Sequence, residues 1–256
     1  MKNKLFCFAL IGAGLVNAQT PDLSGVWKAN AEKSKGLPPQ ATYLAIIEQK
    51  DGRLTQTTAV TTTQRGEQRS MYRWDLSGKE ARGTLGGLPL KSTAKWDGST
   101  LAVAATQPNN RAMTAKYSLS ADGNTLTLDT AITGGPREQL QTIVLEKQPD
   151  SAGEALRKPE ATASTMDRYK NLKLLGGAPA SSIGDTMNGW AFALGKDCQF
   201  CHVQGNFASD DKPEKATARK MVAMVMDVNK NHFGGGQAVR CFTCHQGSNH
   251  PPAAKF

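Results

Sequence analysis

The chain has 256 residues and a formal net charge of +9, from 31 lysines and arginines against 22 aspartates and glutamates. The basic residues are spread along the chain and nowhere form a run of about five, so the composition gives no support to nucleic acid binding. Beyond the N-terminus no segment reaches the roughly 18 consecutive apolar residues of a transmembrane helix, and the length leaves room for two domains.

Residues 1–18 have the layout of a secretory signal peptide. Two lysines precede an apolar run at residues 5–16, and the small-residue pattern VNA follows and ends at Ala18. A positively charged start, a short apolar run and small residues before the cleavage point define such signals, and the run is too short to act as an anchor. We therefore expect a periplasmic or otherwise exported protein that has lost Cys7.

Residues 20–148 alternate between short β-prone runs and turn dipeptides, including Asp-Gly at 51–52, 97–98 and 122–123. Asp-Gly between alternating runs predicts hairpins, and we expect about eight antiparallel strands in up-and-down order that close into a barrel. The opening PDLSGVWKANAEKSK and the hairpins resemble the lipocalin-like barrel domains of secreted bacterial proteins. That resemblance implies a barrel that holds a ligand or serves as a docking module.

Residues 149–166 are rich in Pro, Ala, Ser, Glu and Lys and lack periodicity, which predicts a linker. Residues 167–256 change to helical periodicity. We expect one helix from Ser182, as the N-cap, to Gly195, and a second that starts at Pro213. The fold class is therefore multidomain: a β-barrel followed by a mostly α domain.

Each expected helix is followed by a short motif, DCQFCHV at residues 197–203 and RCFTCHQ at 240–246. A zinc site of four thiolates does not explain the repeated histidine, and such sites suit reducing compartments. A thioredoxin-like switch needs one C-x-x-C in a βαβ context, and two-residue disulfide loops stabilise little. The residues of the motifs are Cys198, Cys201, His202, Cys241, Cys244 and His245.

Covalent haem explains every position of both motifs. The two cysteines form thioether bonds to the vinyl groups, and the next residue becomes the proximal ligand of the iron. Cys198 and Cys201 would hold one haem c, with His202 on the iron. Cys241 and Cys244 would hold a second, with His245 on the iron. Two haem c groups use all four cysteines that remain after export.

The second axial ligand determines whether each iron is saturated or open to small molecules. Met187 lies 11 residues before Cys198, and Met224 lies 17 residues before Cys241, each on the helix that leads to its motif. Met221 shares a helical face with Met224 and is the alternative. His232 and His250 are further alternatives for the second iron, because histidine is the other common haem ligand.

The segments MNGWAFALGKDCQFCHV, ARKMVAMVMDVN and RCFTCHQG resemble the multihaem cytochrome c subunit of bacterial photosynthetic reaction centres, and especially its stand-alone relatives. The resemblance implies a helix with an axial methionine before each C-x-x-C-H. Carried over to this chain, it implies Met187 with His202 and Met224 with His245. The photosynthetic members carry four haems, whereas this chain has motifs for two.

Methionine–histidine ligation saturates an iron, which favours electron transfer over catalysis. The expected function is a periplasmic dihaem cytochrome that carries single electrons between redox partner proteins, with contacts to a membrane complex or to a second copy as further options. One alternative is a peroxidase-like dihaem enzyme with one open haem. The other is a ligand-sensing barrel in which the haems report a redox change.

Overall fold

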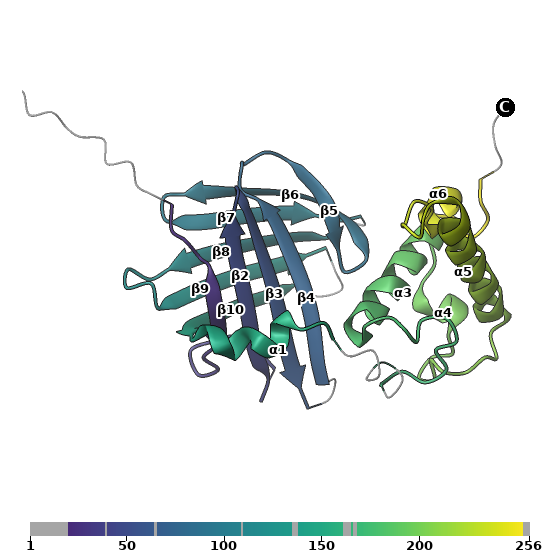
Figure 1. Ribbon diagram of the computed structural model, residues 1–256, viewed down its shortest axis with the longest axis horizontal. Helices are drawn as coiled ribbons and strands as arrows, with labels where there is room; N and C mark the ends of the chain where they lie inside the picture. Colours follow the sequence, from purple (N-terminus) through teal and green to yellow (C-terminus); the bar gives the residue numbers. More distant parts are fainter. Residues whose placement is uncertain are drawn as a thin grey trace, which may run out of the picture.

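The computed structural model describes residues 20–252, apart from 39, 64–65, 109, 135–137, 161–164 and 166–167. The predicted signal peptide at residues 1–18 lies outside the described residues. Strands form the first part of the chain and helices the second, and the two parts lie side by side (Figure 1). This division agrees with the predicted fold class.

The β part is one antiparallel sheet in up-and-down order, as predicted, with ten strands where about eight were expected. β5 and β6 pair around a turn at Gly86–Gly87 that the Asp-Gly pattern does not mark. The end strands β4 and β5 contact each other, but no ladder joins them among the described residues, so the barrel is nearly closed. The strands are β1 Gly25–Ala29, β2 Thr42–Lys50, β3 Arg53–Thr62, β4 Gly66–Asp75, β5 Ala81–Leu85, β6 Leu88–Asp97, β7 Thr100–Thr106, β8 Ala112–Leu119, β9 Thr125–Thr133 and β10 Gln139–Gln148.

The three Asp-Gly dipeptides lie in hairpin turns, as predicted. They connect β2 to β3, β6 to β7 and β8 to β9. In the first, Asp51 has φ 52° and Gly52 has φ 70°, and Lys50 pairs with Arg53 across the turn. Two central residues with positive φ match the twist of the flanking strands, so this turn fixes the register of β2 and β3, whereas in the other two turns the glycine has positive φ and the aspartate does not.

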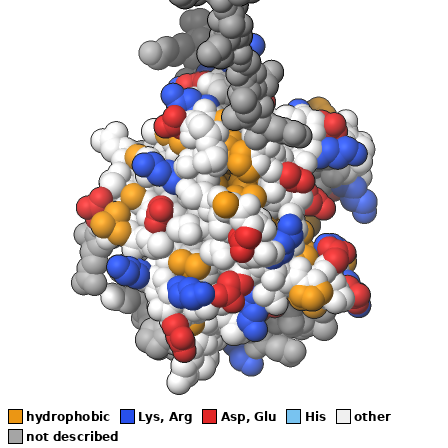
Figure 2. All heavy atoms as spheres, turned by 90° about the vertical axis from the view of Figure 1, so that its left-hand side faces the viewer, with side chains coloured by type: hydrophobic (Ala, Val, Ile, Leu, Met, Phe, Trp, Pro, Cys, Tyr) orange, Lys and Arg blue, Asp and Glu red, His pale blue; other side chains and the backbone are white. Residues whose placement is uncertain are grey.

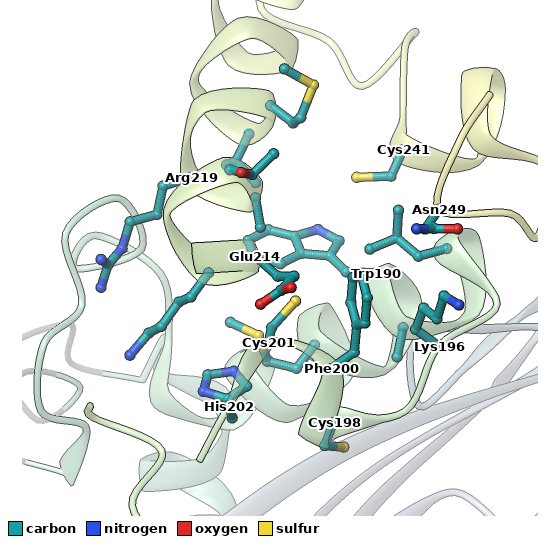
Figure 3. Close-up of a pocket in the computed structure, with 18 of the residues that line it drawn as sticks. Trp190, Lys196, Cys198, Phe200, Cys201, His202, Glu214, Arg219, Cys241 and Asn249 are labelled. Atoms are coloured by element: carbon teal, nitrogen blue, oxygen red, sulfur yellow. The ribbon is translucent and has the colours of Figure 1, made fainter. Parts of the chain in front are cut away.

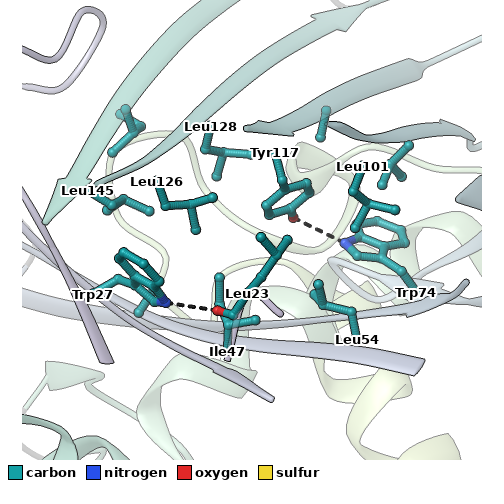
Figure 4. Close-up of a cluster of buried hydrophobic side chains, with 14 of the residues drawn as sticks. Leu23, Trp27, Ile47, Leu54, Trp74, Leu101, Tyr117, Leu126, Leu128 and Leu145 are labelled. Atoms are coloured by element: carbon teal, nitrogen blue, oxygen red, sulfur yellow. Dashed lines mark hydrogen bonds between the residues drawn. The ribbon is translucent and has the colours of Figure 1, made fainter. Parts of the chain in front are cut away.

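The barrel interior is filled by large side chains, among them Trp27 and Trp74, which are 0% and 2% exposed (Figure 4). Trp74 Nε1 donates to the Tyr117 hydroxyl at 3.2 Å, and that hydroxyl donates to Gln56 Oε1 at 2.8 Å. Gln56 Nε2 donates to the Tyr43 hydroxyl at 3.0 Å. Burial raises the pKa of both tyrosines, so their hydroxyls stay protonated within this connected network.

The segment after β10 differs from the predicted linker. Residues Asp150–Gly153 form the 3-10 helix η1, and Glu154–Arg157 form α1. Leu156 is buried against Val26, Ile46 and Ala59 on the outer face of the barrel. Leu156 holds α1 on the barrel together with Arg69 of β4, which donates to the carbonyls of Lys158 at 2.7 Å and Ala155 at 3.3 Å, so the first part of the predicted linker packs on the barrel.

Four helices of the second part carry the candidate site. The predicted first helix is terminated by Gly195, its left-handed C-cap, as expected, but it begins after Pro179, so Ser182 lies inside its first turn and is not the N-cap. The second begins at Pro213, as predicted, and ends at His232. The helices are α3 Ala180–Leu194, α4 Cys198–Cys201, α5 Pro213–His232 and α6 Cys241–His245.

The turn between β5 and β6 packs directly against α3. Gly87 has φ 77°, and a Cβ built there would overlap the carbonyl oxygen of Asp185. Asn188 Nδ2 donates to the carbonyl of Gly86 at 3.4 Å. Only glycine permits this approach, so the barrel supports the helix that carries Met187.

The face of the barrel turned away from the helices carries acidic and basic side chains interspersed with small apolar areas (Figure 2). None of the helices in the described part of the chain is both long enough and apolar enough to span a membrane.

Candidate functional site

The first motif forms a single helical turn, α4. The Asp197 carboxylate accepts a hydrogen bond from the Phe200 amide at 3.1 Å and caps this turn. Cys198 and Cys201 are three residues apart on the helix, so their sulfur atoms share one face. The amide of His202 donates to the Cys198 carbonyl at 3.0 Å, which fixes the histidine directly behind the pair.

The second motif forms α6 and is held in place by a residue on α5. Asn229 is buried, and its Nδ2 donates to the Val239 carbonyl at 2.8 Å, while the Val239 amide donates back to Asn229 Oδ1 at 2.9 Å. The Arg240 amide donates to Thr243 Oγ1 at 3.0 Å and caps α6. Asn229 was not predicted as a site residue, although it lies in the quoted segment ARKMVAMVMDVN.

Residues of both motifs line one cavity of about 570 Å³ (Figure 3), whereas Cys244 of the second motif is exposed and is not part of its wall. Cys201 and Cys241 lie on either side of the Trp190 side chain in this view. The volume is within the range of small-molecule and cofactor sites, roughly 300–1,000 Å³. The wall includes Met187, Trp190, Leu194, Cys198, Phe200, Cys201, His202, Met221, Val222, Cys241, His245 and His250.

The imidazole ring of each motif histidine forms a hydrogen bond with a backbone carbonyl. His202 Nδ1 lies 3.0 Å from the Phe207 carbonyl oxygen, and His245 Nδ1 lies 2.9 Å from the Ser248 carbonyl oxygen. A carbonyl only accepts, so Nδ1 carries a proton in both rings, and in a neutral ring the lone pair is then on Nε2. A neutral imidazole in this tautomer is the form that binds a metal through Nε2.

All four cysteines of the described residues are free thiols. Burial raises the pKa of Cys201 and of Cys241, so these two remain protonated and weakly nucleophilic at neutral pH. Across residues 20–252, within the described ranges, no three His, Cys, Asp or Glu side chains are grouped as a metal ion site would need.

The helical part has a small apolar core of its own. Among its described residues, the buried apolar side chains are Ala180, Ile183, Ala193 and Val222. Trp190 and Phe200 instead line the cavity, and Phe242 stacks on Phe192 with ring centroids 5.2 Å apart. A large apolar group in this cavity would complete the packing, so cavity, thiols and histidines together fit a covalently attached haem.

The structure places the predicted axial residues differently. Met187, Met221 and His250 line the cavity, whereas Met224 is 49% exposed and does not form part of its wall. His232, the other alternative ligand for the second iron, is the last residue of α5, is exposed and does not line the cavity. The structure therefore brings Met187 and Met221 together with both motif histidines.

Asp210, in the segment between the first motif and α5, is the centre of a cluster of charged side chains. Asp210 Oδ1 lies 3.2 Å from Lys215 Nζ and 2.9 Å from Arg219 Nη1, and its Oδ2 lies 3.1 Å from Lys173 Nζ. Asn171 Nδ2 also donates to Asp210 at 2.8 Å. Hydrogen bonds from Lys173, Lys215, Arg219 and Asn171 hold the pKa of Asp210 well below its usual range.

This depressed pKa predicts acid sensitivity of the helical part. A carboxyl with a lowered folded-state pKa contributes stability that is complete above its unfolded value of 3.8 and is lost as the pH falls toward the folded pKa. Melting followed by absorbance should show this loss between about pH 4 and about pH 2. In Asp210→Asn the dependence should be weaker, and equal losses in the two proteins would contradict the prediction.

The repeated C-x-x-C-H sequence, each copy on a short helix with residues in the wall of an apolar cavity, is the attachment motif of c-type cytochromes. The family model of the photosynthetic reaction centre cytochrome C subunit matches residues 126–255, about half of the chain. The chain belongs to this family. The match begins in β9 and covers the whole helical part.

Individual relatives match shorter segments. Cytochrome c-554 of Chloroflexus aurantiacus is 40% identical over 81 residues, 29% of this chain and 20% of that protein. The photosynthetic reaction center cytochrome c subunit of Roseobacter denitrificans is 30% identical over 100 residues, 35% of this chain and 27% of that protein. The photosynthetic reaction center cytochrome c subunit of Thermochromatium tepidum is 42% identical over 60 residues, which are 22% of this chain and 15% of that protein. This chain thus spans about a quarter or less of these relatives.

Solved structures align with the β part. Secretory abundant heat soluble protein 4 from Ramazzottius varieornatus is 15% identical and covers 51% of this chain and 99% of its own, with a TM-score of 0.39. Zebrafish ileal bile acid-binding protein is 16% identical and covers 49% of this chain and 98% of its own, with a TM-score of 0.36.

Proposed function

We propose that the protein is an exported dihaem c-type cytochrome that carries single electrons between redox partner proteins. The observation that supports this most is the pair of C-x-x-C-H motifs on one apolar cavity, each with a histidine whose Nε2 is left free. The relatives named as reaction centre cytochrome subunits support a redox partner or complex, and the signal-like N-terminus supports export.

Each residue has a defined part in this proposal. Cys198 and Cys201 hold one haem through thioether bonds, and Cys241 and Cys244 hold the other. A bound haem supplies a one-electron redox centre whose potential depends on its axial ligands. The backbone carbonyls behind the histidines fix the two imidazole rings in the tautomer that ligates iron.

The methionine ligands complete the two sites. Met187 lines the cavity and is the proposed partner of His202. The sequence pattern favours Met224 as the partner of His245, but Met221 lines the cavity and Met224 does not. We therefore assign Met221 to the second site. Two saturated irons favour electron transfer over peroxidase-like chemistry, which needs an open position.

Single methionine replacements test this function. Met187→Ala and Met221→Ala should each remove about half of the methionine-to-iron absorption of the oxidised protein and lower the potential of one haem, since methionine–histidine ligation raises it. Met224→Ala, at an exposed position one turn away, is the matched control and should leave both haems unchanged. The measurements are the oxidised spectrum and a redox titration.

The reverse result in these variants would change the assignment of the second methionine ligand. Loss of the absorption in Met224→Ala with retention in Met221→Ala would restore the assignment favoured by the sequence. A high-spin signal in the unsubstituted protein would show an open iron and would favour a dihaem enzyme instead.

We further propose that the barrel supports and orients the haem-carrying helices. Its interior is occupied by the Trp, Tyr and Leu side chains of the core, and its Gly86–Gly87 turn packs on α3. These contacts favour a supporting role over the alternative of a ligand-sensing barrel.

A further inference from the structure

The carbonyl oxygen of Phe207 accepts hydrogen bonds from two side chains. His202 Nδ1 lies 3.0 Å from it, and Lys215 Nζ, on α5, lies 2.9 Å from it. Lys215 is 8% exposed, which is rare for a lysine. The ammonium group of Lys215 is therefore two hydrogen bonds away from the imidazole ring of the first motif.

The position of the Lys215 ammonium group is fixed. It also donates to the carbonyl of Ala208 at 3.0 Å and to the carbonyl of Ser209 at 2.6 Å, and it lies 3.2 Å from Asp210 Oδ1, so four acceptors surround its three protons. The chain between the first motif and α5 thus wraps around a single buried cation. A surface lysine samples many rotamers, whereas this one presents its charge at a constant place.

The cluster around this ammonium carries excess positive charge. Asp210 is the carboxylate that contacts Lys215, and it also contacts Lys173 and Arg219. One negative charge thus stands against three positive ones. The second motif lacks this arrangement, because Ser248, whose carbonyl accepts from His245, receives no side-chain cation in the part of the chain that the structure describes.

We propose that Lys215 raises the reduction potential of the haem ligated by His202 above that of the haem ligated by His245. A carbonyl that accepts from Nδ1 increases the electron density of the imidazole and stabilises the oxidised iron. A second, cationic donor on the same oxygen weakens this effect, and its charge disfavours the oxidised state through space. Lys215 is a positioning and tuning residue, and the inference rests on the proposed function, which assigns His202 to an iron.

The test is a redox titration of the holoprotein and its Lys215→Met variant. Removing one cation at this distance should shift the oxidised-to-reduced ratio of one haem about tenfold toward the oxidised form. A tenfold shift equals about 59 mV for a one-electron couple. The second haem, with its own ligand environment, should keep its potential and serves as the reference within the same molecule.

Asp210→Asn separates electrostatics from loosened packing. It removes the neutralising charge, so the potential of the first haem should rise, opposite in sign to the change in Lys215→Met. Lys173→Met, at a more exposed position, should lower the potential by a smaller factor. If Lys215→Met does not fold, Asp210→Asn and Lys173→Met still test whether the charges of this cluster set the potential of the first haem, because their shifts should have opposite signs.

Two outcomes overturn the inference, and they differ from failure of the proposed function. Shifts of the same sign in Lys215→Met and Asp210→Asn would show a structural effect, and unchanged potentials would show no tuning at all. Absence of covalent haem from the exported protein would instead refute the proposed function. Haem content by mass spectrometry, measured on every variant, distinguishes these cases.

Discussion

Replacement of Cys241 and Cys244 by alanine is expected to remove one of two covalently bound haems from the exported protein. The same substitution at Cys198 and Cys201 should remove the other. The cysteines of each pair are three residues apart on a helical turn, a spacing that would let both sulfur atoms form thioether bonds to one haem. Intact-mass spectrometry and haem-to-protein ratios measure the effect, which is a decrease of about one half in each double variant.

The structure supplies a matched control for this experiment. Gln199 lies between the first two cysteines and is exposed, so Gln199→Ala should keep both haems. A full haem complement in either double variant would show that the cysteines of that motif do not attach haem. Loss of both haems from each double variant would show instead that the two sites assemble only together.

Removal of both haems should also weaken the fold of the helical part. Its described residues bury few apolar side chains of their own, while Trp190 and Phe200 face the cavity. Exposed apolar walls cost about 25 cal/mol for each Å² left in water. The protein with all four cysteines replaced should therefore have less helical circular dichroism and a lower melting temperature than either double variant.

Local signals predicted much of the architecture. The Asp-Gly turns, the start of α5 at Pro213 and the end of α3 at Gly195 depend on the backbone preferences of one or two residues, so they can be read directly from the sequence. The Gly86–Gly87 turn has no Asp-Gly mark, and its glycines are needed because α3 packs against them. Leu156 becomes ordered for a similar reason, through contact with strands distant in sequence.

In the candidate site, too, local features could be predicted from the sequence, whereas features that depend on packing between distant segments could not. The C-x-x-C-H spacing carries its chemistry locally, because cysteines three residues apart share a helical face. Met221 and Met224 also share a face, so periodicity alone cannot separate them, and only the packing of α5 shows which one meets the cavity. In the sequence, Lys215 and Asn229 cannot be distinguished from other polar residues of the helix. Their roles become visible only in the structure, where they donate to backbone carbonyls of other segments.

Truncation of Trp27 to alanine is expected to destabilise the barrel by about 3–5 kcal/mol, as for other large buried aromatic residues. Trp27 is 0% exposed on β1, between β2 and β10, and its Nε1 donates to the Leu23 carbonyl at 3.0 Å. A typical folding free energy is roughly 5–15 kcal/mol, so this loss is a large fraction of the total. Trp96→Ala, at a partly buried position, should cost less and is the control.

The same variant tests whether the two parts are separate folding units. Between the barrel and α3 the contacts are made by β4, β6 and the β5–β6 turn. In Trp27→Ala the strand signal in circular dichroism should melt at a lower temperature, while the haem absorbance keeps its transition. If both signals moved together, the barrel and the helices would form one cooperative unit, and the division near residues 149–166 would not be a domain boundary. Because covalent haem would hold the helical part together from within, we expect two transitions and the barrel to melt first.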